Sequence, residues 1–405
     1  MILCRPEVSL RKTRLYKSII SMRPADFSEN KSGHLISTPQ GYWAFVPAPL
    51  PPSLDLTWEF VRQISEAERA LSELAGIARN LPNPHLLINP FIRREAILSS
   101  RIEGTQAGLS DLLFFEADNT SEPRVADVRE VLNYVRALQY GLTRLKDLPV
   151  SLRLLREIHE QLMQGVRGAG LTPGEFRRSQ NWIGLPGCTL MDATYVPPPV
   201  TEMNEALGAL ENYWHTPSSL PLVVRLAFIH YQFEAIHPFL DGNGRAGRLL
   251  LTLLLCEAGA LPQPLLYLSA FFEHHRQDYY RLLLAVSQHG AWSEWIAFFL
   301  RGVAEQSLDA VRRSHALLDL WRRYREQFQS VRSSALLLGL IDKLFDAPAI
   351  TIAGITRQFG ITPRAAQMNV DKLIEAGILK EATGRQRNRI FVAPEIISIT
   401  EAESV

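Results

Sequence analysis

The sequence predicts a mainly α-helical protein with a second, smaller domain near its C-terminus. Most long segments place apolar residues at steps of three and four, the spacing of an amphipathic helix, and few alternate with period two. A turn-rich segment at 182–199, WIGLPGCTLMDATYVPPP, predicts a β-hairpin that ends at the prolines. After about residue 330, short helices and strand-like runs indicate a separate winged-helix domain.

Stop signals mark several of the expected helices. The first ends before LPNP, because proline disfavours helix at the residue before it. The second is closed by Gly104, a residue type common just past a helix end. The expected helices of the main body are Asp55–Asn80, Asn89–Glu103, Val125–Leu145, Ser151–Gly165, Val200–Trp214, Leu220–Ile236, Ala246–Gly259, Asp278–Gln288 and Trp292–Arg325.

The C-terminal domain has the pattern helix, turn, helix and two-stranded wing. Its strand-like runs, ILKEAT and RIFVAP, flank the basic sequence GRQRN. The expected helices are Ser334–Phe345, Ile352–Phe359 and Pro363–Gly377, with the turn Gly360–Thr362 between the last two.

Composition indicates a globular protein that can bury a full core. Of its 405 residues, 46% are hydrophobic and 21% are charged, and the length predicts two or three domains. A net charge of +1 argues against a dominant basic or acidic partner surface. The cysteines, Cys4, Cys188 and Cys256, are far apart and odd in number, which favours neither a disulfide framework nor a zinc site.

These features predict a cytoplasmic protein without a membrane segment. The longest apolar run, Leu249–Cys256, is too short to span a bilayer. The N-terminus has basic residues but lacks the apolar centre of a signal peptide. Residues 1–30 are expected to form a tail. Because Met22 begins a more ordinary sequence, it stays open whether residues 1–21 belong to the native product.

The most polar cluster of the chain, IHPFLDGNGRAGRLL at 236–250, lies between two expected apolar helices. Pro238 disfavours helix at the residue before it, while Gly242 and Gly244 allow the backbone to come close to a ligand. The helix that follows offers free N–H groups and the positive end of its dipole. This combination predicts an anion site, most often a phosphate site.

Side chains of the same loop favour phosphoryl or nucleotidyl transfer. Arg245 and Arg248 place two planar cations on adjacent turns, where they can bind phosphate oxygens. Asp241 is a carboxylate beside them that can hold Mg²⁺, and His237 can accept a proton near neutral pH. The alternative is a solvated glycine-rich loop with a structural histidine, which explains any one residue better than it explains the whole cluster.

The stretch HPFLDGNGRAGR resembles the core motif of the Fic family, HPFxDGNGRxxR, at every defined position. PGEFRRSQNWIG (173–184), YVPPP (195–199), HYQFEAIHPF (230–239) and SEWIAFFLRGV (293–303) are also similar to the family. The resemblance implies a Fic-type helical bundle in which 182–199 is the flap that holds a target segment. It also implies transfer of AMP from ATP to a Ser, Thr or Tyr hydroxyl of a target protein.

The resemblance further implies a role for each residue of the loop. His237 would be the base that takes the hydroxyl proton, and Asp241 would hold Mg²⁺ on the α- and β-phosphates. Arg248 would reach the γ-phosphate. The other implied nucleotide-binding residues are Gly242, Asn243, Gly244, Arg245, Tyr279 and Tyr280. For the two tyrosines, core packing is the alternative.

A second short sequence, SSRIEGT at 99–105, lies far upstream of the loop. Ser99 and Glu103 are four apart and share a helix face, and Gly104 suits the position past the helix end. Alone, this pattern indicates a helix terminus with an exposed glutamate. It resembles the Fic autoinhibitory motif, [S/T]xxxE[G/N], which implies that Glu103 pairs with Arg248 and withholds it from the γ-phosphate.

The expected organisation follows from both motifs. The parts are a tail at 1–30, a helical region with the inhibitory helix at 31–120, a Fic catalytic core at 121–305, a connecting helix at 306–332 and a winged helix at 333–405.

Several alternatives stay open at this point. A winged-helix DNA-binding regulator with a nucleotide-sensing Fic core is one, because Arg385, Arg387 and Arg389 alternate along the wing. A target-presenting or dimerising role for that domain is another. The Fic site would suit removal of AMP or use of another nucleotide as well. The expected partners are ATP with Mg²⁺ and a protein target, with self-modification and a homodimer as further options.

Overall fold

The structure is a computed structural model, and it describes residues 22–28, 31–55, 57–79, 85–118, 126–166, 168, 170–329 and 335–402. It is mainly helical, as predicted. Most of the expected tail, residues 1–21 and 29–30, lies outside the described residues. Within the described ranges, no helix is long and apolar enough to cross a lipid bilayer.

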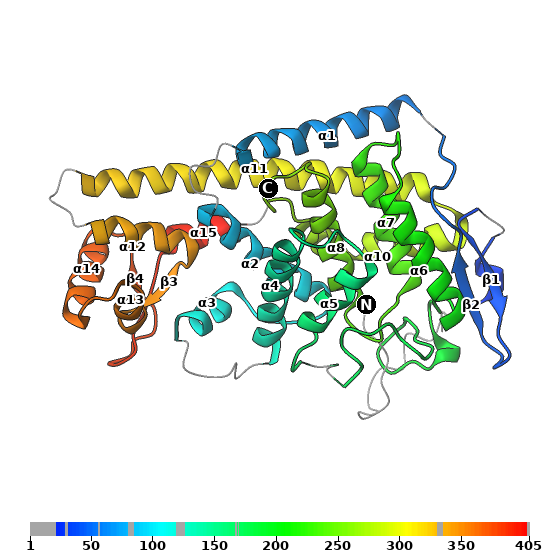
Figure 1. The fold of residues 1–405 in the computed structure, drawn as a ribbon, viewed down its shortest axis with the longest axis horizontal. Helices are drawn as coiled ribbons and strands as arrows, with labels where there is room; N and C mark the ends of the chain where they lie inside the picture. The colour runs from blue at the N-terminus through cyan, green and yellow to red at the C-terminus, as the bar shows by residue number, and fades with distance from the viewer. Residues whose placement is uncertain are drawn as a thin grey trace, which may run out of the picture.

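The molecule is elongated, and α1 and α11 lie side by side along its long axis (Figure 1). The α-helices are α1 (Trp58–Arg79), α2 (His85–Ile102), α3 (Leu109–Asp118), α4 (Ala126–Arg144), α5 (Leu152–Leu162), α6 (Val200–His215), α7 (Leu222–Ile236), α8 (Asn243–Glu257), α9 (Ser269–His274), α10 (Arg276–His289), α11 (Trp292–Gln329), α12 (Ala335–Asp346), α13 (Ile352–Phe359), α14 (Pro363–Glu375) and α15 (Pro394–Glu401). The 3₁₀ helices are Pro24–Asp26 and Leu190–Asp192. The strands are β1 (Gly33–Ser37), β2 (Trp43–Pro47), β3 (Ala349–Thr351), β4 (Lys380–Glu381) and β5 (Ile390–Val392).

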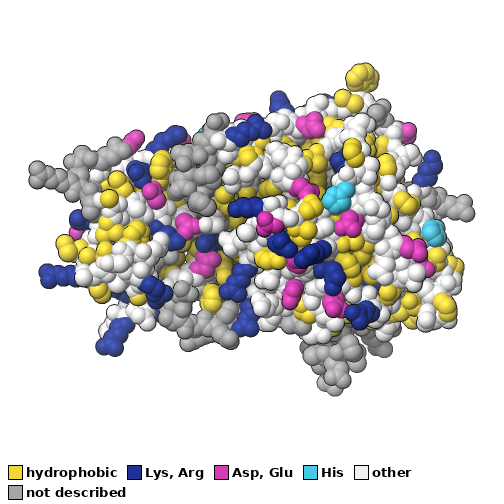
Figure 2. Space-filling view, viewed as in Figure 1, with side chains coloured by type: hydrophobic (Ala, Val, Ile, Leu, Met, Phe, Trp, Pro, Cys, Tyr) yellow, Lys and Arg dark blue, Asp and Glu magenta, His cyan; other side chains and the backbone are white. Residues whose placement is uncertain are grey.

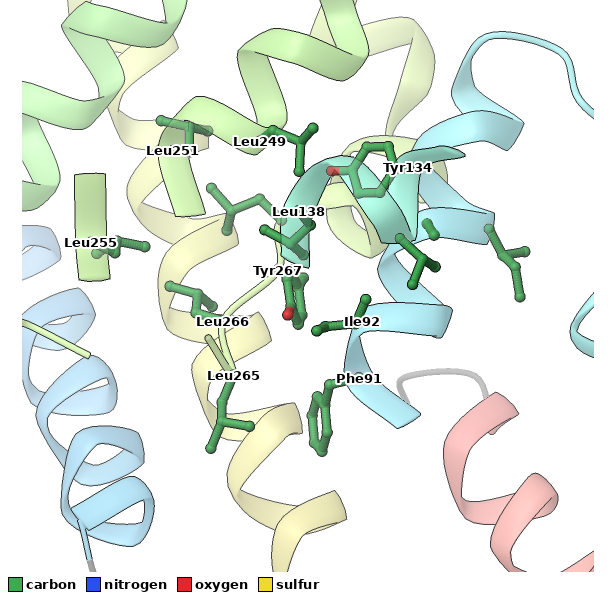
Figure 3. Packing of buried hydrophobic residues seen from close by; sticks show 14 of the residues in the cluster. Phe91, Ile92, Tyr134, Leu138, Leu249, Leu251, Leu255, Leu265, Leu266 and Tyr267 are labelled. Atoms are coloured by element: carbon green, nitrogen blue, oxygen red, sulfur yellow. The ribbon is translucent and has the colours of Figure 1, made fainter. Parts of the chain in front are cut away.

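The centre of the main body is formed by α7 and α8. Both are apolar nearly all round, and almost every residue in them is buried, as expected for a helix that neighbours cover on all sides. Figure 3 shows side chains of α2, α4, α8 and the segment before α9 packed in one core, among them Phe91, Leu138, Leu249 and Tyr267. The loop between α7 and α8 is therefore held from both ends by buried helices.

The helix α2 touches both parts of the molecule. Its first half packs against α12 of the C-terminal part, where Arg93 Nη1 donates to the Asp346 carbonyl at 2.6 Å and Asn89 Nδ2 donates to the Asp346 carboxylate. Its second half packs against α4, α8 and α9. The last turn of α2 therefore reaches the main body while its beginning is bound to the C-terminal part.

The C-terminal part contains a three-stranded antiparallel sheet in the order β3-β5-β4. Thr351 and Thr362 cap α13 and α14 by accepting from the backbone N–H groups of Gly354 and Ala365. This part docks on the long helix α11, whose Arg313 donates to the carbonyl of Ile399 at 2.5 Å. In the view of Figure 2, Lys and Arg side chains are scattered over this end of the molecule.

Two sequence expectations about β-structure need correction. The segment 182–199 forms one isolated bridge, Ile183 with Tyr195, and not a regular hairpin. Its neighbour Val196 accepts a backbone bond from Phe45 of β2, and the prolines that follow have no N–H to extend a ladder. The hairpin β1–β2, with Gly33 opposite Pro47, was not predicted at all.

The expectation of no disulfide framework needs a correction at Cys188. This residue is disulfide-bonded, while Cys256 is free. Cys4 lies outside the described residues. Distance along the sequence does not limit distance in space, so spacing alone could not exclude this bond.

Candidate functional site

The loop from His237 to Gly242 reverses the chain between α7 and α8. His237 ends α7 in the left-handed region, with φ 49°, and Gly242 precedes α8 with φ 79°. The His237 carbonyl accepts from Arg177 Nε at 3.0 Å and from Asn181 Nδ2 at 3.1 Å. The Arg177 guanidinium is buried and also donates to the carbonyls of Ser179 and Pro198. These bonds compensate the unusual backbone conformation at His237.

Asn243 fixes the other end of the loop. Its side-chain Oδ1 accepts from the Phe239 N–H at 2.8 Å, and its Nδ2 donates to the Phe239 carbonyl at 2.8 Å. Because the Asn243 side chain is buried and bound to Phe239, the group that Asn243 would offer a ligand is its backbone N–H. That N–H belongs to the first turn of α8, where backbone donors lack partners within the helix and the dipole favours anions.

The His237 ring is a neutral base at the edge of a cavity. It is 8% exposed, and burial lowers its pKa to about 4. Its Nδ1 lies 3.3 Å from the Glu234 carbonyl, which can only accept, so Nδ1 carries the hydrogen. The other ring nitrogen, Nε2, then keeps its lone pair and can accept a proton.

A second buried histidine, His159, supports the loop through a hydrogen bond to its backbone. The Gly174 N–H donates to its Nδ1 at 3.0 Å, so its Nε2 carries the hydrogen and donates to the Asp241 carbonyl at 2.9 Å. Its ring stacks on Phe239, with centroids 3.7 Å apart. Burial lowers the pKa of His159 to about 4, so it stays neutral in this structural role.

One cavity contains most of the residues that the two motifs predict. It is lined by Glu103, His237, Asp241, Gly242, Asn243, Gly244, Arg248, Tyr279 and Tyr280. The free space between these side chains is about 70 Å³, well below the ~300 Å³ of typical small-molecule sites. A nucleotide would therefore have to displace at least one lining side chain.

Arg248 is bound from three sides by the end of α2. Its Nε donates to Ser99 Oγ at 2.8 Å, and its Nη2 donates to the Ser99 carbonyl at 2.9 Å and to Glu103 Oε1 at 2.8 Å. The contact between Glu103 and Arg248 is therefore present, as the second motif predicts. Burial raises the pKa of Glu103, but attraction to nearby cations, chiefly Arg248, and the hydrogen bond from Arg248 together lower that pKa to about 2.

Glu103 stands just outside the helix that carries it. The helix α2 ends at Ile102, and Gly104 follows with φ 100°, a conformation that favours glycine. The Glu103 side chain is 21% exposed, whereas that of Arg248 is 2% exposed. The acid of this ion pair is thus at the rim of the cavity and the cation is at its floor.

Arg245 does not line the cavity. Its side chain points to α4, where Nη1 lies 3.4 Å from Glu130 Oε2, and both side chains are buried. Glu130 also accepts from Thr105 Oγ1 at 3.1 Å. The predicted contact of the Arg245 guanidinium with phosphate stays a prediction, since in this structure that guanidinium is paired with Glu130.

The two tyrosines of α10 differ in their surroundings. Tyr279 is 1% exposed, and its hydroxyl lies 2.8 Å from His230 Nε2. Tyr280 is partly exposed, and its hydroxyl is 3.4 Å from the Ile102 carbonyl. Both rings border the cavity. Tyr280 is therefore the more exposed of the two rings, while Tyr279 is held in the core.

Asp241 is the cavity carboxylate that could hold a metal. Its Oδ1 accepts from the Gly242 N–H at 2.8 Å. The described residues contain no group of three or more His, Cys, Asp or Glu side chains that could hold an ion. This donor set suits Mg²⁺ that arrives with phosphates and keeps several waters, and it does not suit a metal held by protein alone.

Sequence reasoning missed several residues of the cavity wall. They come from α7, α10 and the segment 182–199, and they are Ile183, Tyr195, Tyr231, Glu234, Ala235, Leu283, Leu284 and Ser287. Most are apolar or aromatic. Glu234 is the exception, and its place directly before the motif, in FEAIHPF, was the available signal.

Comparisons with known proteins match two parts of the chain. Residues 61–143 match the Fic/DOC family N-terminal model, and residues 149–255 match the Fic/DOC family model. A probable protein adenylyltransferase of Aquifex aeolicus is 31% identical over 175 residues, which cover 42% of this chain and 49% of that protein. A protein named protein adenylyltransferase Fic, from Aedes aegypti, is 30% identical over 184 residues, which cover 44% of this chain and 33% of that protein. The chain thus spans about half or less of the relatives that it matches.

Solved structures confirm the Fic-type fold. A Fic family protein from Desulfovibrio desulfuricans superposes with a TM-score of 0.54 at 19% identity, over 85% of this chain and 98% of that chain. The structure of Fic-1 residues 134–508 from C. elegans superposes with a TM-score of 0.51 at 20% identity, over 64% of this chain and 74% of that chain.

Proposed function

This chain belongs to the Fic/DOC family, and from that premise we propose that it transfers AMP from ATP to a hydroxyl side chain of a target protein. The observation that carries the proposal is the neutral His237 ring, held beside the N-terminus of α8 in the cavity whose floor is Arg248. A base, an anion site and a fixed cation within one cavity are the groups that such a displacement needs.

The proposed reaction uses His237 as the base. The target hydroxyl gives its proton to His237 Nε2 as its oxygen forms a bond to the α-phosphorus. The bond from that phosphorus to the oxygen leading to the β-phosphate breaks, and pyrophosphate leaves. Because burial keeps His237 neutral, the base is ready across the physiological pH range.

The other residues would position the nucleotide. Backbone N–H groups of Gly242, Asn243 and Gly244 would bind phosphate oxygens at the start of α8, and Arg248 would bind the γ-phosphate. Asp241 would hold Mg²⁺, which when bound neutralises phosphate charge. Tyr280 would contact the nucleotide base.

In the proposed resting state, Glu103 restrains the enzyme. Its carboxylate takes the Arg248 donor that the γ-phosphate needs, at 2.8 Å, and lies in the same narrow cavity. Ser99 supports this state by accepting from Arg248 Nε. A nucleotide could then enter only in a pose that leaves Arg248 to Glu103.

The test compares wild type with Glu103→Gly, using ATP labelled on the α-phosphate and a lysate as the source of targets. Transfer should rise about tenfold or more, since a charge-assisted hydrogen bond contributes ~1.5–3 kcal/mol and about 1.4 kcal/mol corresponds to tenfold. The double variant Glu103→Gly, His237→Ala is the matched control and should transfer no label. Label transfer by that control at the rate of Glu103→Gly would sink the assignment of the base.

The same assay separates the related reactions. Labelled GTP, CTP and UTP test whether another nucleotide is preferred, and incubation of labelled product with wild type tests removal of AMP. Incorporation into the chain itself measures self-modification. A Glu103→Gly protein that transfers none of the four nucleotides would contradict the proposed activity.

A second candidate function concerns residues 333–405, which we infer to be a winged helix. The order α12, β3, α13, α14, β4, β5 and the exposed side chains of Arg385 and Arg387 in the turn between β4 and β5 support this inference. Arg389 is held by Gln367 of α14 at 3.1 Å. If this domain binds DNA, Arg385→Ala with Arg387→Ala should weaken binding and flatten its salt dependence. Absence of binding by the whole protein at low salt would leave it as a protein-interaction module.

A further inference from the structure

A second acid, Glu234, lies in the cavity beside Arg248. It is in the last turn of α7, three residues before His237, and its side chain borders the cavity together with Glu103 and Arg248. Its Oε1 is buried and has no hydrogen-bond partner within the described part of the chain. A buried carboxylate oxygen without a partner is costly, so its presence needs a functional reason.

The two acids lie along the same face of α8, one turn apart. A Cβ on Gly244 would lie 2.3 Å from Glu103 Oε1 and 2.9 Å from Arg248 Nη1. A Cβ on Gly247 would lie 2.7 Å from Glu234 Oε1. Positions three apart in a helix are neighbours on its surface. The absence of side chains at these two glycines thus leaves room for both carboxylates next to one guanidinium.

One cation cannot compensate two carboxylates in a buried site. Glu103 makes the hydrogen bond to Arg248, and its pKa is held at about 2, so it is the ionised acid of the pair. Burial raises the pKa of Glu234 to about 7, with Arg248 lowering it and Glu103 raising it. The other titratable groups that border it, Tyr279 and His237, are neutral at pH 7. Glu234 therefore holds a proton for much of the time while Glu103 is in place.

We propose that Glu234 is a positioning residue that serves as the second counter-ion of Arg248. Glu234 carries a proton while Glu103 is bound to Arg248. When Glu103 withdraws, Glu234 releases that proton to solvent. The resulting carboxylate then pairs with the buried Arg248 cation until a phosphate arrives. Only the arrival of phosphate rests on the proposed function; the exchange of counter-ions does not.

This exchange couples opening of the site to pH. In the closed state Glu234 is protonated, and in the open state it is ionised, so opening releases a proton and is favoured as the pH rises. A phosphate that binds Arg248 would repel the Glu234 anion and return the proton. Without Glu234, withdrawal of Glu103 would leave the buried Arg248 without any nearby carboxylate, which is strongly unfavourable.

The first test uses thermal unfolding of four proteins at pH 5.5 and pH 8: wild type, Glu234→Gln, Glu103→Gln and the double variant. Glutamine has the shape of a protonated glutamate but cannot ionise. In the wild-type background at pH 8, Glu234→Gln should raise Tm by at least ~2 °C, because it removes an ionisation that folding opposes. In the Glu103→Gln background at pH 8, it should lower Tm by at least ~2 °C, because it removes the remaining anion.

The sign of the Tm change at pH 8 is thus expected to reverse between the two backgrounds. At pH 5.5 the change in the wild-type background should shrink, because Glu234 is already protonated there. Glu305→Gln, at an exposed acid that is 52% accessible, controls for net charge and should act equally in both backgrounds. A Glu234→Gln effect of the same sign and size in both backgrounds would overturn the proposal.

A second measurement does not depend on folding of the double variant. The carboxyl ¹³C signal of Glu234, identified by its loss in Glu234→Gln, is followed against pH in wild type and in Glu103→Gln. Its midpoint should fall by about one pH unit or more when Glu103 is neutralised, since one unit is about 1.4 kcal/mol. A midpoint that stays or rises would overturn the proposal. Neither measurement uses nucleotide, so each can fail while AMP transfer stands.

Discussion

The two arginines of α8 are three residues apart, and each faces a glutamate from another part of the chain, yet the two ion pairs differ. Arg245 and Glu130 are 4% and 3% exposed at their side chains, and they lie 3.4 Å apart on the side of α8 that faces α4. Arg248 and Glu103 lie 2.8 Å apart in the cavity, and Glu103 is 21% exposed. The two guanidinium groups are buried to a similar degree, so the pairs differ in how exposed their glutamates are.

The position of each acid in its own helix explains the difference. Glu130 is in the body of α4, so it cannot leave Arg245 unless α4 unfolds or shifts. Glu103 follows the last residue of α2, next to a glycine, so a small backbone change there can withdraw it. The same chemistry therefore supports the fold at one site and can act as a removable restraint at the other.

The largest expected change in stability comes from breaking the ion pair between Arg245 and Glu130. Glu130→Ala should lower the free energy of unfolding by ~3–5 kcal/mol, because it leaves a buried guanidinium without its anion. Glu103→Ala, the matched change at the other pair, should lower it by about 1 kcal/mol, since its acid is partly solvated. Denaturant unfolding of both variants measures this. Equal losses would contradict the distinction between the two pairs.

The next effect concerns catalysis at the Arg248 pair. In the Glu103→Gly background, Arg248→Ala should lower the kcat/KM for AMP transfer by about 10²-fold, the size seen when one donor to a developing charge is removed. Arg248→Lys should recover only part of it, because an ammonium cannot replace the planar fork. Steady-state kinetics at several ATP concentrations measures both, and an unchanged kcat/KM would remove Arg248 from the nucleotide site.

Acid should weaken both sides of α8 to a similar degree. Burial lowers the pKa of His159, near Arg245, to about 4, and that of His230, near Arg248, to about 3. Because the unfolded value is ~6.5, the unfolded chain binds more protons below it, so stability is lost as the pH falls from 6.5 toward these values. Each histidine should contribute a loss of about 2 kcal/mol between pH 7 and pH 5.

This pH prediction is checked by denaturant unfolding at both pH values. His159→Gln should remove about one histidine's share of the loss, and the exposed His215, changed to Gln, serves as the control that removes none. A loss of the same size in His159→Gln and wild type would show that His159 is charged or solvated in the folded protein.

The smallest expected effects come from two hydroxyls. Ser99 accepts from Arg248, and Thr105 donates to Glu130, so each supports one of the two pairs. Ser99→Ala and Thr105→Val should each cost about 1 kcal/mol of stability. Only Ser99→Ala should also raise AMP transfer, by a few fold, since only that hydroxyl stabilises the restrained state. A rise in Thr105→Val instead would reverse the assignment of the two sides.

Much of the site could be predicted because its geometry is local. The order apolar helix, Pro-containing turn, glycine pair and apolar helix in 236–250 is written in neighbouring residues, and the structure has α7, a loop and α8 there. The end of α2 beside Gly104 was predictable for the same reason. The contact of Glu103 with Arg248 joins residues 145 positions apart, and it was predicted through family resemblance and not through periodicity.

What could not be predicted depends on long-range packing. The direction of Arg245 is set by Glu130 on α4, which no local pattern links to the loop. The pairing of β1 with β2 was missed because each strand is five residues long, too short for a clear alternation. Glu234 was overlooked because its place directly before the motif was its one sequence signal, and its burial beside Arg248, which raises its pKa, appears only in the folded chain.

The buried Arg177 guanidinium has a mechanical consequence. One planar group donates to His237 of the loop, to Ser179 just before the segment 182–199, and to Pro198 near the end of that segment. Three stretches of backbone are thereby hydrogen-bonded to one planar guanidinium, whose internal distances are set by covalent bonds. His237 and the segment 182–199, which would hold a target, are therefore kept in a fixed position relative to each other. Any movement of His237 relative to the segment 182–199 would therefore have to break hydrogen bonds of this buried guanidinium.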